Sequence, residues 1–177
     1  MKRLVCFGSM ALLVVSVVVT GMATGAPAVG TAKARGDYSV GAFWGNSGGR
    51  SVRHARDYSR GYRSYARQAP TITPQIARHE AAGVGQNIAS AQMQFGEMRK
   101  TTTDAAALAS LTLIDQQLVA AAKAHALMHE MCKMETIDGD ATMQCCKDVD
   151  AALAKAISEH EKMMKGLGVE PVESVVN

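Results

Sequence analysis

Three stretches of the chain carry apolar residues at intervals of three and four positions, which is the spacing of one helical face. They span residues 74–99, 104–134 and 141–165. Short polar segments separate them, so consecutive helices are expected to fold back antiparallel on one another. The sequence has no β-hairpin signal and no internal repeat. The pattern therefore predicts an all-α protein, an up-down three-helix bundle over residues 71–168 followed by a short tail at 169–177.

The expected helix ends are marked by capping residues. Thr73 precedes Pro74, and a threonine followed by proline is a typical helix start. Thr103 is expected to cap the second helix, and Asp138 or Asp140 the third.

The predicted core is the set of residues on the three apolar stripes, which are rich in alanine and contain one aromatic residue, Phe95. Small side chains bury little area, and small bundles are marginally stable without a further constraint. In the second stripe the aliphatic residues give way to His125, His129 and Cys132, and the third stripe begins with Cys146. These residues stand where leucine would stabilise more, which implies a compensating disulfide or bound ion.

The chain begins with a sequence typical of a secretory signal. Lys2 and Arg3 precede an apolar run from Leu4 to Val19, and small residues follow up to Gly25. Residues 1–25 are expected to be removed on export to the periplasm, the cell envelope or the medium, where disulfides persist. A retained membrane anchor is the alternative, but a spanning helix needs about 20 apolar residues and this run is shorter.

Residues 26–70 differ from the rest of the chain in charge and composition. From Thr31 to Pro70 there are eight Lys or Arg and two acids, whereas from Thr71 to Asn177 there are nine and fourteen. The segment is rich in Gly, Ser, Arg and Tyr and poor in aliphatic residues, which predicts a flexible basic arm. The arginines at residues 50–67 are spaced three or four apart, so a fourth helix in this segment is an alternative prediction. The arm is expected to contact an anionic envelope surface, and nucleic acid is not an expected partner of an exported protein.

The two loops between the helices decide which side chains share a level of the bundle. Folding about Asp138 places the end of the second helix opposite the start of the third, and folding about Thr102 brings the first helix alongside. One end of the bundle is therefore expected to gather the candidate metal ligands Glu80, His125, His129, Cys132 and Cys146.

The chemistry of this set favours a soft metal ion. His125 and His129 are four apart, so both rings leave the same helix face one turn apart, as in helical zinc sites. Cys132 extends the row, and four methionines surround it. Thiolate and thioether ligands together favour copper(I), whereas imidazole and thiolate also suit zinc. The sequence predicts a non-catalytic protein that binds copper or, as the next choice, zinc.

A disulfide is the alternative role for the cysteines. Cys132 is expected to face Cys145 or Cys146, and a bridge there would close a loop of about 14 residues and stabilise the fold by about 3 kcal/mol. The protein would then be a structural or interaction protein of the cell envelope. No nucleophile can be paired with a base, and the Glu-x-x-His motif of ferritin-like di-iron bundles does not occur. An enzyme is therefore not predicted.

Overall fold

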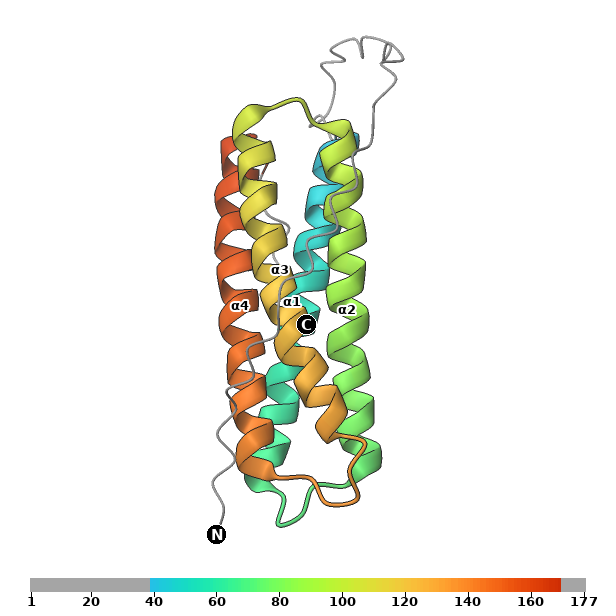
Figure 1. Cartoon of the computed structure of the whole chain (residues 1–177). Helices are drawn as coiled ribbons and strands as arrows, with labels where there is room; N and C mark the ends of the chain where they lie inside the picture. Colours follow the sequence, from blue (N-terminus) through green and yellow to red (C-terminus); the bar gives the residue numbers. More distant parts are fainter. Residues whose placement is uncertain (1–38, 170–177) are drawn as a thin grey trace, which may run out of the picture. The chain divides into compact units, whose positions relative to one another are not determined.

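The computed structural model describes residues 39–169, which form four α-helices and no β-strand (Figure 1). The all-α class predicted from the sequence is confirmed. The predicted signal peptide, the first part of the predicted arm and nearly all of the predicted tail lie outside the described residues. The helices are α1 (Val40–Gln68), α2 (Pro74–Thr101), α3 (Ala105–Met131) and α4 (Gly139–Gly166).

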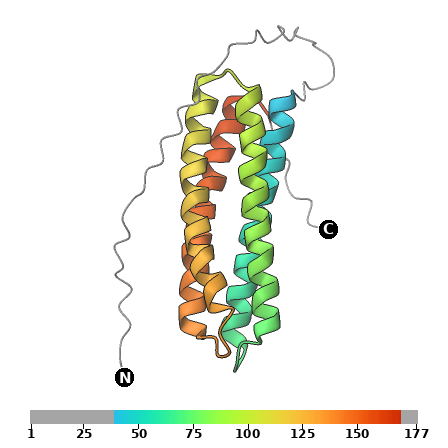
Figure 2. The same cartoon turned by 45° about the vertical axis from the view of Figure 1, so that its right-hand side comes forward.

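The four helices lie side by side, and consecutive helices are connected at alternate ends (Figures 1 and 2). α1 packs against α2 and α4, and α3 packs against the same two helices. The connections 69–73 and 132–138 lie at one end, here called the cysteine end because Cys132 and Cys146 lie there. The connection 102–104 lies at the opposite end.

The helix starts lie where the sequence predicts, with two corrections to the caps. α2 begins at Pro74 as predicted, but the side chain of Thr73 makes no capping hydrogen bond. α3 is capped by Asp104 rather than Thr103, because the Asp104 carboxylate accepts a hydrogen bond of 2.7 Å from the backbone N–H of Ala107. Asp138 caps α4 by accepting from the N–H groups of Asp140 and Ala141. At the far end of α4, Gly168 adopts a φ of 69°, a left-handed conformation that glycine tolerates and that ends the helix.

The predicted stripes form most of the core. The stripe of α2 is buried along its whole length, and that of α4 is buried except for half-buried Ile157. In α2 and α4 the buried positions alternate at four and three residues, the spacing of left-handed coiled-coil packing. The buried stripe residues of α2 are Ala77, Ala81, Val84, Ile88, Ala91, Phe95 and Met98.

α1 occupies a segment that the sequence assigns to a flexible arm while allowing a fourth helix, and the structure describes it as a helix. The buried face of α1 is built mostly from Gly, Ala and Ser, with Val52 and Tyr62 as its larger members. Such a face has low hydropathy, so composition suggests an arm. Its burial comes instead from close packing, because large side chains of α2 and α4 fill the space above the small residues.

Three glycines of α1 show this packing directly. A Cβ atom at Gly48 would lie 2.7 Å from the ring of Phe95, and one at Gly49 would lie 2.3 Å from Cε1 of His160. A Cβ atom at Gly45 would lie 2.8 Å from the sulfur of Met164. These distances are shorter than real Cβ contacts. A larger residue at Gly48 or Gly49 would have to displace a buried ring, whereas one at Gly45 would have to displace a flexible methionine side chain.

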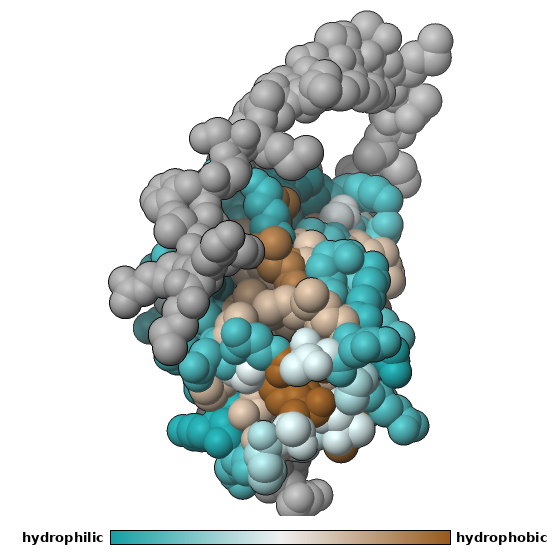
Figure 3. All heavy atoms as spheres, turned by 60° about the horizontal axis from the view of Figure 1, so that its bottom comes forward, coloured by the Kyte–Doolittle hydropathy of each residue, from teal (hydrophilic) through white to brown (hydrophobic). Residues whose placement is uncertain are grey.

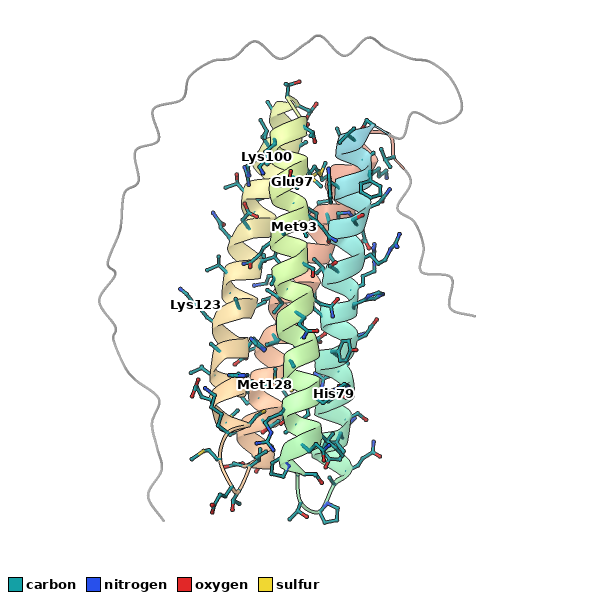
Figure 4. All side chains as sticks on the ribbon, turned by 90° about the vertical axis from the view of Figure 1, so that its right-hand side faces the viewer. His79, Met93, Glu97, Lys100, Lys123 and Met128 are labelled. Carbon is teal, nitrogen blue, oxygen red and sulfur yellow. The ribbon has the colours of Figure 1, made fainter. Side chains whose placement is uncertain are left out.

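α3 is apolar on its outer face as well as on its core face. Leu113, Val119 and Leu127 are exposed by 44%, 47% and 64%, and Lys123 extends away from the bundle (Figure 4). Among the described helices α3 alone is long and apolar enough to cross a membrane, a criterion that core helices of soluble proteins also meet.

Candidate functional site

The cysteine end of the bundle holds two buried thiols. Cys132 follows the last residue of α3 and Cys146 lies two turns into α4, and their exposed fractions are 1% and 0%. Ile72 and Ile137, one from each connection, join the core at this end. Figure 3 views this end and shows apolar surface bordered by hydrophilic residues. The thiols therefore lie in a dry environment beneath the two connections.

Cys132 is held by two polar partners. Its sulfur lies 3.4 Å from the hydroxyl oxygen of Tyr62 and 3.6 Å from the carbonyl oxygen of Ala77. The carbonyl can only accept, so the Cys132 thiol donates to Ala77 and the Tyr62 hydroxyl donates to the sulfur. Tyr62 comes from α1 and is fully buried. It ties α1 to the junction of α2 and α3.

Cys146 contacts a third sulfur atom. Its Sγ lies 3.7 Å from Sδ of Met128, and both residues are fully buried. Figure 4 shows Met128 on α3 close to the cysteine end. The hydroxyl of Ser59, on α1, donates to the carbonyl oxygen of Cys146 at 3.1 Å. The sulfur cluster, defined here as Cys132, Cys146 and Met128, thus draws its members from α4 and the end of α3 and is backed by α1.

Burial sets the protonation of this cluster. It raises the pKa of the Cys146 thiol to about 12, and neighbouring Cys145 adds to the effect. Burial also raises the pKa of the Cys132 thiol, although the hydrogen bond with Tyr62 acts to lower it. The pKa of the Tyr62 phenol is raised by the same desolvation. All three groups are neutral at physiological pH, so a metal ion would have to displace protons to bind the thiols.

The two candidate histidines do not face the sulfur cluster. Nε2 of His125 lies 2.8 Å from the carbonyl oxygen of Ala81, and its ring fills the space above Gly85 of α2. The His129 side chain is 48% exposed, and its Nδ1 lies 3.9 Å from the carboxylate of Glu130. Their ring centroids are 6.0 Å apart. The pair is therefore adjacent, as its spacing predicts, but it lies between α2 and α3 and at the surface.

The remaining candidates also occupy separate places. The carboxylate of Glu80 lies 3.8 Å from the position of a Cβ on Gly61 of α1, and Cys145 is half-buried. No disulfide joins the cysteines of the described residues. Nor do residues 39–169 hold a group of three or more His, Cys, Asp or Glu side chains placed to bind one metal ion. The five-residue metal site predicted from the sequence is not assembled in this form.

Tyr62 and Met128 are residues of the site that the sequence pattern does not single out. Tyr62 lies in the segment predicted to be a flexible arm, so its contact with Cys132 is not predicted. Met128 is predicted only as a neighbour of the histidine row, whereas His129 is predicted on the stripe. A strict alternation of four and three from Leu118 gives Ala121, His125, Met128 and Cys132, so the coiled-coil spacing would have identified Met128.

Comparisons of the chain with protein-family models, with curated proteins and with solved structures found no match.

Proposed function

We propose that this bundle binds one copper(I) ion through the sulfur cluster at the cysteine end. The observation that carries the proposal is the contact of 3.7 Å between Cys146 Sγ and Met128 Sδ in a fully buried setting, with the Cys132 thiol in the same part of the core. Thiolate and thioether sulfur are the ligands that copper(I) prefers over harder ions. The set lacks the further imidazole or carboxylate that a closed tetrahedral zinc site needs, which favours copper over zinc.

The charge balance of such a site is favourable. Binding of Cu⁺ to both thiols would release two protons and leave two thiolates and one metal ion, a net charge of −1. Positive charge is near, because Arg63 acts to lower the pKa of Cys146 and Arg78 that of Cys132. Tyr62 can keep donating its hydroxyl hydrogen to the Cys132 sulfur, which stabilises a thiolate more than a thiol.

The proposal gives each predicted ligand a definite role. Cys132, Cys146 and Met128 bind the ion, and Tyr62 supports Cys132. His125, His129 and Glu80 do not take part, because His125 is bonded to α2, His129 points into solvent and Glu80 lies beside α1. Export, predicted from residues 1–25, is part of the same proposal.

Copper(I) titration under reducing, oxygen-free conditions tests the assignment, with a chromogenic copper(I) chelator as the competitor. We expect about one equivalent bound by the chain, and a loss of at least tenfold in affinity for Cys132→Ser and for Cys146→Ser. Met128→Leu keeps the volume and removes the sulfur, so a smaller loss is expected. The affinity for copper(I) should also decrease as pH is lowered, because protons compete for the thiols.

Two control variants separate this site from the one predicted by sequence. Cys145→Ser, and His125→Ala combined with His129→Ala, should leave copper affinity within about twofold of the unaltered chain. Circular dichroism of each copper-free variant shows whether the bundle is folded. Unchanged affinity in both cysteine variants, or binding abolished by the histidine pair alone, would overturn the proposal.

A further inference from the structure

A row of arginines follows the edge of α1 that faces α4. Arg53, Arg56, Arg60 and Arg63 recur every three or four residues, and Arg50 and Arg67 extend the row at either end. The row covers about 25 Å at 1.5 Å per residue. Four of these arginines form ion pairs with α4. Arg53 lies 3.4 Å from the carboxylate of Glu161, and the next three arginines pair with Asp150.

Asp150 is shared by three guanidinium groups. Its Oδ1 accepts from Nε of Arg56 at 2.7 Å and from Nε of Arg60 at 3.1 Å, and its Oδ2 lies 4.0 Å from Nη1 of Arg63. One carboxylate balances one positive charge, so this group keeps a formal charge of +2. The bonds from Arg56 and Arg60 use Nε, which leaves their terminal NH₂ groups to donate to another anion.

The whole edge is basic and narrow. Six arginines of α1 stand against three carboxylates: Asp57 on α1 itself, and Asp150 and Glu161 on α4. The arginine side chains remain between 23% and 48% exposed where they pair with α4. Partly exposed ion pairs contribute little to stability, so folding alone does not account for a row of this length.

We propose that this arginine row binds a linear polyanion that carries phosphate groups at regular intervals. Successive arginines leave α1 about one helical turn, 5.4 Å, apart along the helix axis, and guanidinium groups bind phosphate oxygens in a paired geometry. Asp150 holds the guanidinium groups of Arg56 and Arg60 side by side before the ligand arrives. The carboxylates of Asp57 and Glu161 lie beside the row. A broad anionic membrane would meet them as well, whereas a narrow chain can follow the arginines alone.

Binding of a fluorescent inorganic polyphosphate of about 25 phosphates to the chain, followed by anisotropy, tests the proposal. Arg60→Gln combined with Arg63→Gln should lower the affinity at least tenfold at low salt. For single-stranded nucleic acid, each lost phosphate contact reduces the slope of log affinity against log salt by about 0.7. The affinity of this variant for polyphosphate should likewise depend less steeply on salt than that of the unaltered chain.

The matched control removes the same charge on another helix. Arg99 and Lys100 of α2 also pair with carboxylates, those of Asp115 and Glu97, so Arg99→Gln combined with Lys100→Gln alters net charge equally. This control should bind polyphosphate within about threefold of the unaltered chain. Equal losses in the two double variants would show that only net charge matters and would overturn the proposal.

Two further probes distinguish the ligand classes. Inorganic phosphate should bind far more weakly than polyphosphate, because it can meet only one or two arginines. Vesicles of phosphatidylglycerol and phosphatidylcholine should bind more weakly than polyphosphate at equal phosphate concentration. Vesicle binding without polyphosphate binding would assign the row to a membrane surface, and equal binding of inorganic phosphate would reduce it to a single anion site. Either result would refute the proposal that the arginine row binds a linear polyanion.

Discussion

The imidazole of His160 packs directly against Gly49, where an added Cβ atom would collide with three atoms of the ring. One turn away on α1, the carbonyl oxygen of Gly45 accepts a hydrogen bond of 2.9 Å from Nε2 of the same ring. His160 of α4 thus contacts α1 at two glycines, by packing against Gly49 and by a hydrogen bond to the carbonyl oxygen of Gly45. These two contacts help to explain how a helix whose buried face is mostly Gly, Ala and Ser is held in the bundle.

Gly49→Ala should destabilise the bundle by about 1–3 kcal/mol, because the new methyl group must displace a buried ring. The matched control is Gly96→Ala on α2, where a Cβ would meet nothing within 4 Å. That change should stabilise by up to about 1 kcal/mol through helix propensity. Urea unfolding followed by circular dichroism measures both, and similar effects of the two substitutions would contradict the packing described here.

His160 makes stability depend on pH. Burial, assisted by the charge of Arg53, lowers its pKa from 6.5 to about 4, and the hydrogen bond to Gly45 only partly opposes this. Protonation therefore favours the unfolded chain. The stabilisation is complete above pH 6.5 and is lost as pH falls toward 4, a loss on the order of 3 kcal/mol.

The variant His160→Gln keeps a side-chain donor for the carbonyl oxygen of Gly45 but cannot titrate. Its unfolding free energy should be lower than that of the unaltered chain at pH 7 and should change less between pH 6.5 and 4. Urea titrations at several pH values give both curves. Parallel curves would mean that His160 is not the group responsible.

Asp150 titrates in a lower window. Its partial burial acts to raise its pKa, but the hydrogen bond and charge of Arg56, reinforced by Arg60, outweigh burial and hold the pKa below its usual range. The carboxylate then stabilises the fold above its unfolded pKa near 3.8, and this contribution is lost as pH falls below about 4. Asp150→Asn should cost about 1 kcal/mol at pH 7, and this cost should shrink as pH falls and the carboxylate is protonated. Urea unfolding at several pH values measures it, and a cost that does not change with pH would point to packing.

Tyr62 stabilises the bundle more through its ring than through its hydroxyl. Tyr62→Phe removes the hydrogen bond to Cys132 and should cost about 1 kcal/mol, because sulfur is a weak acceptor. Tyr62→Ala also empties a fully buried site at the junction of α1, α2 and α3 and should cost about 3–5 kcal/mol. Unfolding midpoints in urea compare the two. Equal losses would show that the hydroxyl matters more than the ring.

Much of the bundle could be predicted from the sequence because α2, α3 and α4 carry their core residues on visible stripes. Pro74 and Asp138 mark helix starts by their own chemistry. α1 could not be recognised, because a face of Gly, Ala and Ser gains its burial from Phe95, His160 and Met164 of other helices. That dependence on distant partners leaves no stripe of large apolar residues, and only the spacing of the arginines indicates a helix.

The candidate site could be predicted only in part from the sequence. Placing Cys132 and Cys146 at one end required only antiparallel helices and a short loop. Deciding that Met128, and not His129, turns inward required the exact helical phase over eight turns, where an error of one residue rotates a side chain by 100°. Tyr62 could enter the site only once α1 was known to pack there.

The burial of Ile72 and Ile137 at the cysteine end should also limit the rate at which a thiol reagent or a metal ion reaches the sulfur atoms. Ile72 packs near Gly139, the first residue of α4, and Ile72 and Ile137 both belong to the buried core. Because Cys132 and Cys146 are 1% and 0% exposed, a reagent should reach them only after a local opening of the fold. At high reagent concentration the reaction rate should level off at the rate of this opening. The same opening rate would limit how quickly a bound copper ion is released to a competing chelator.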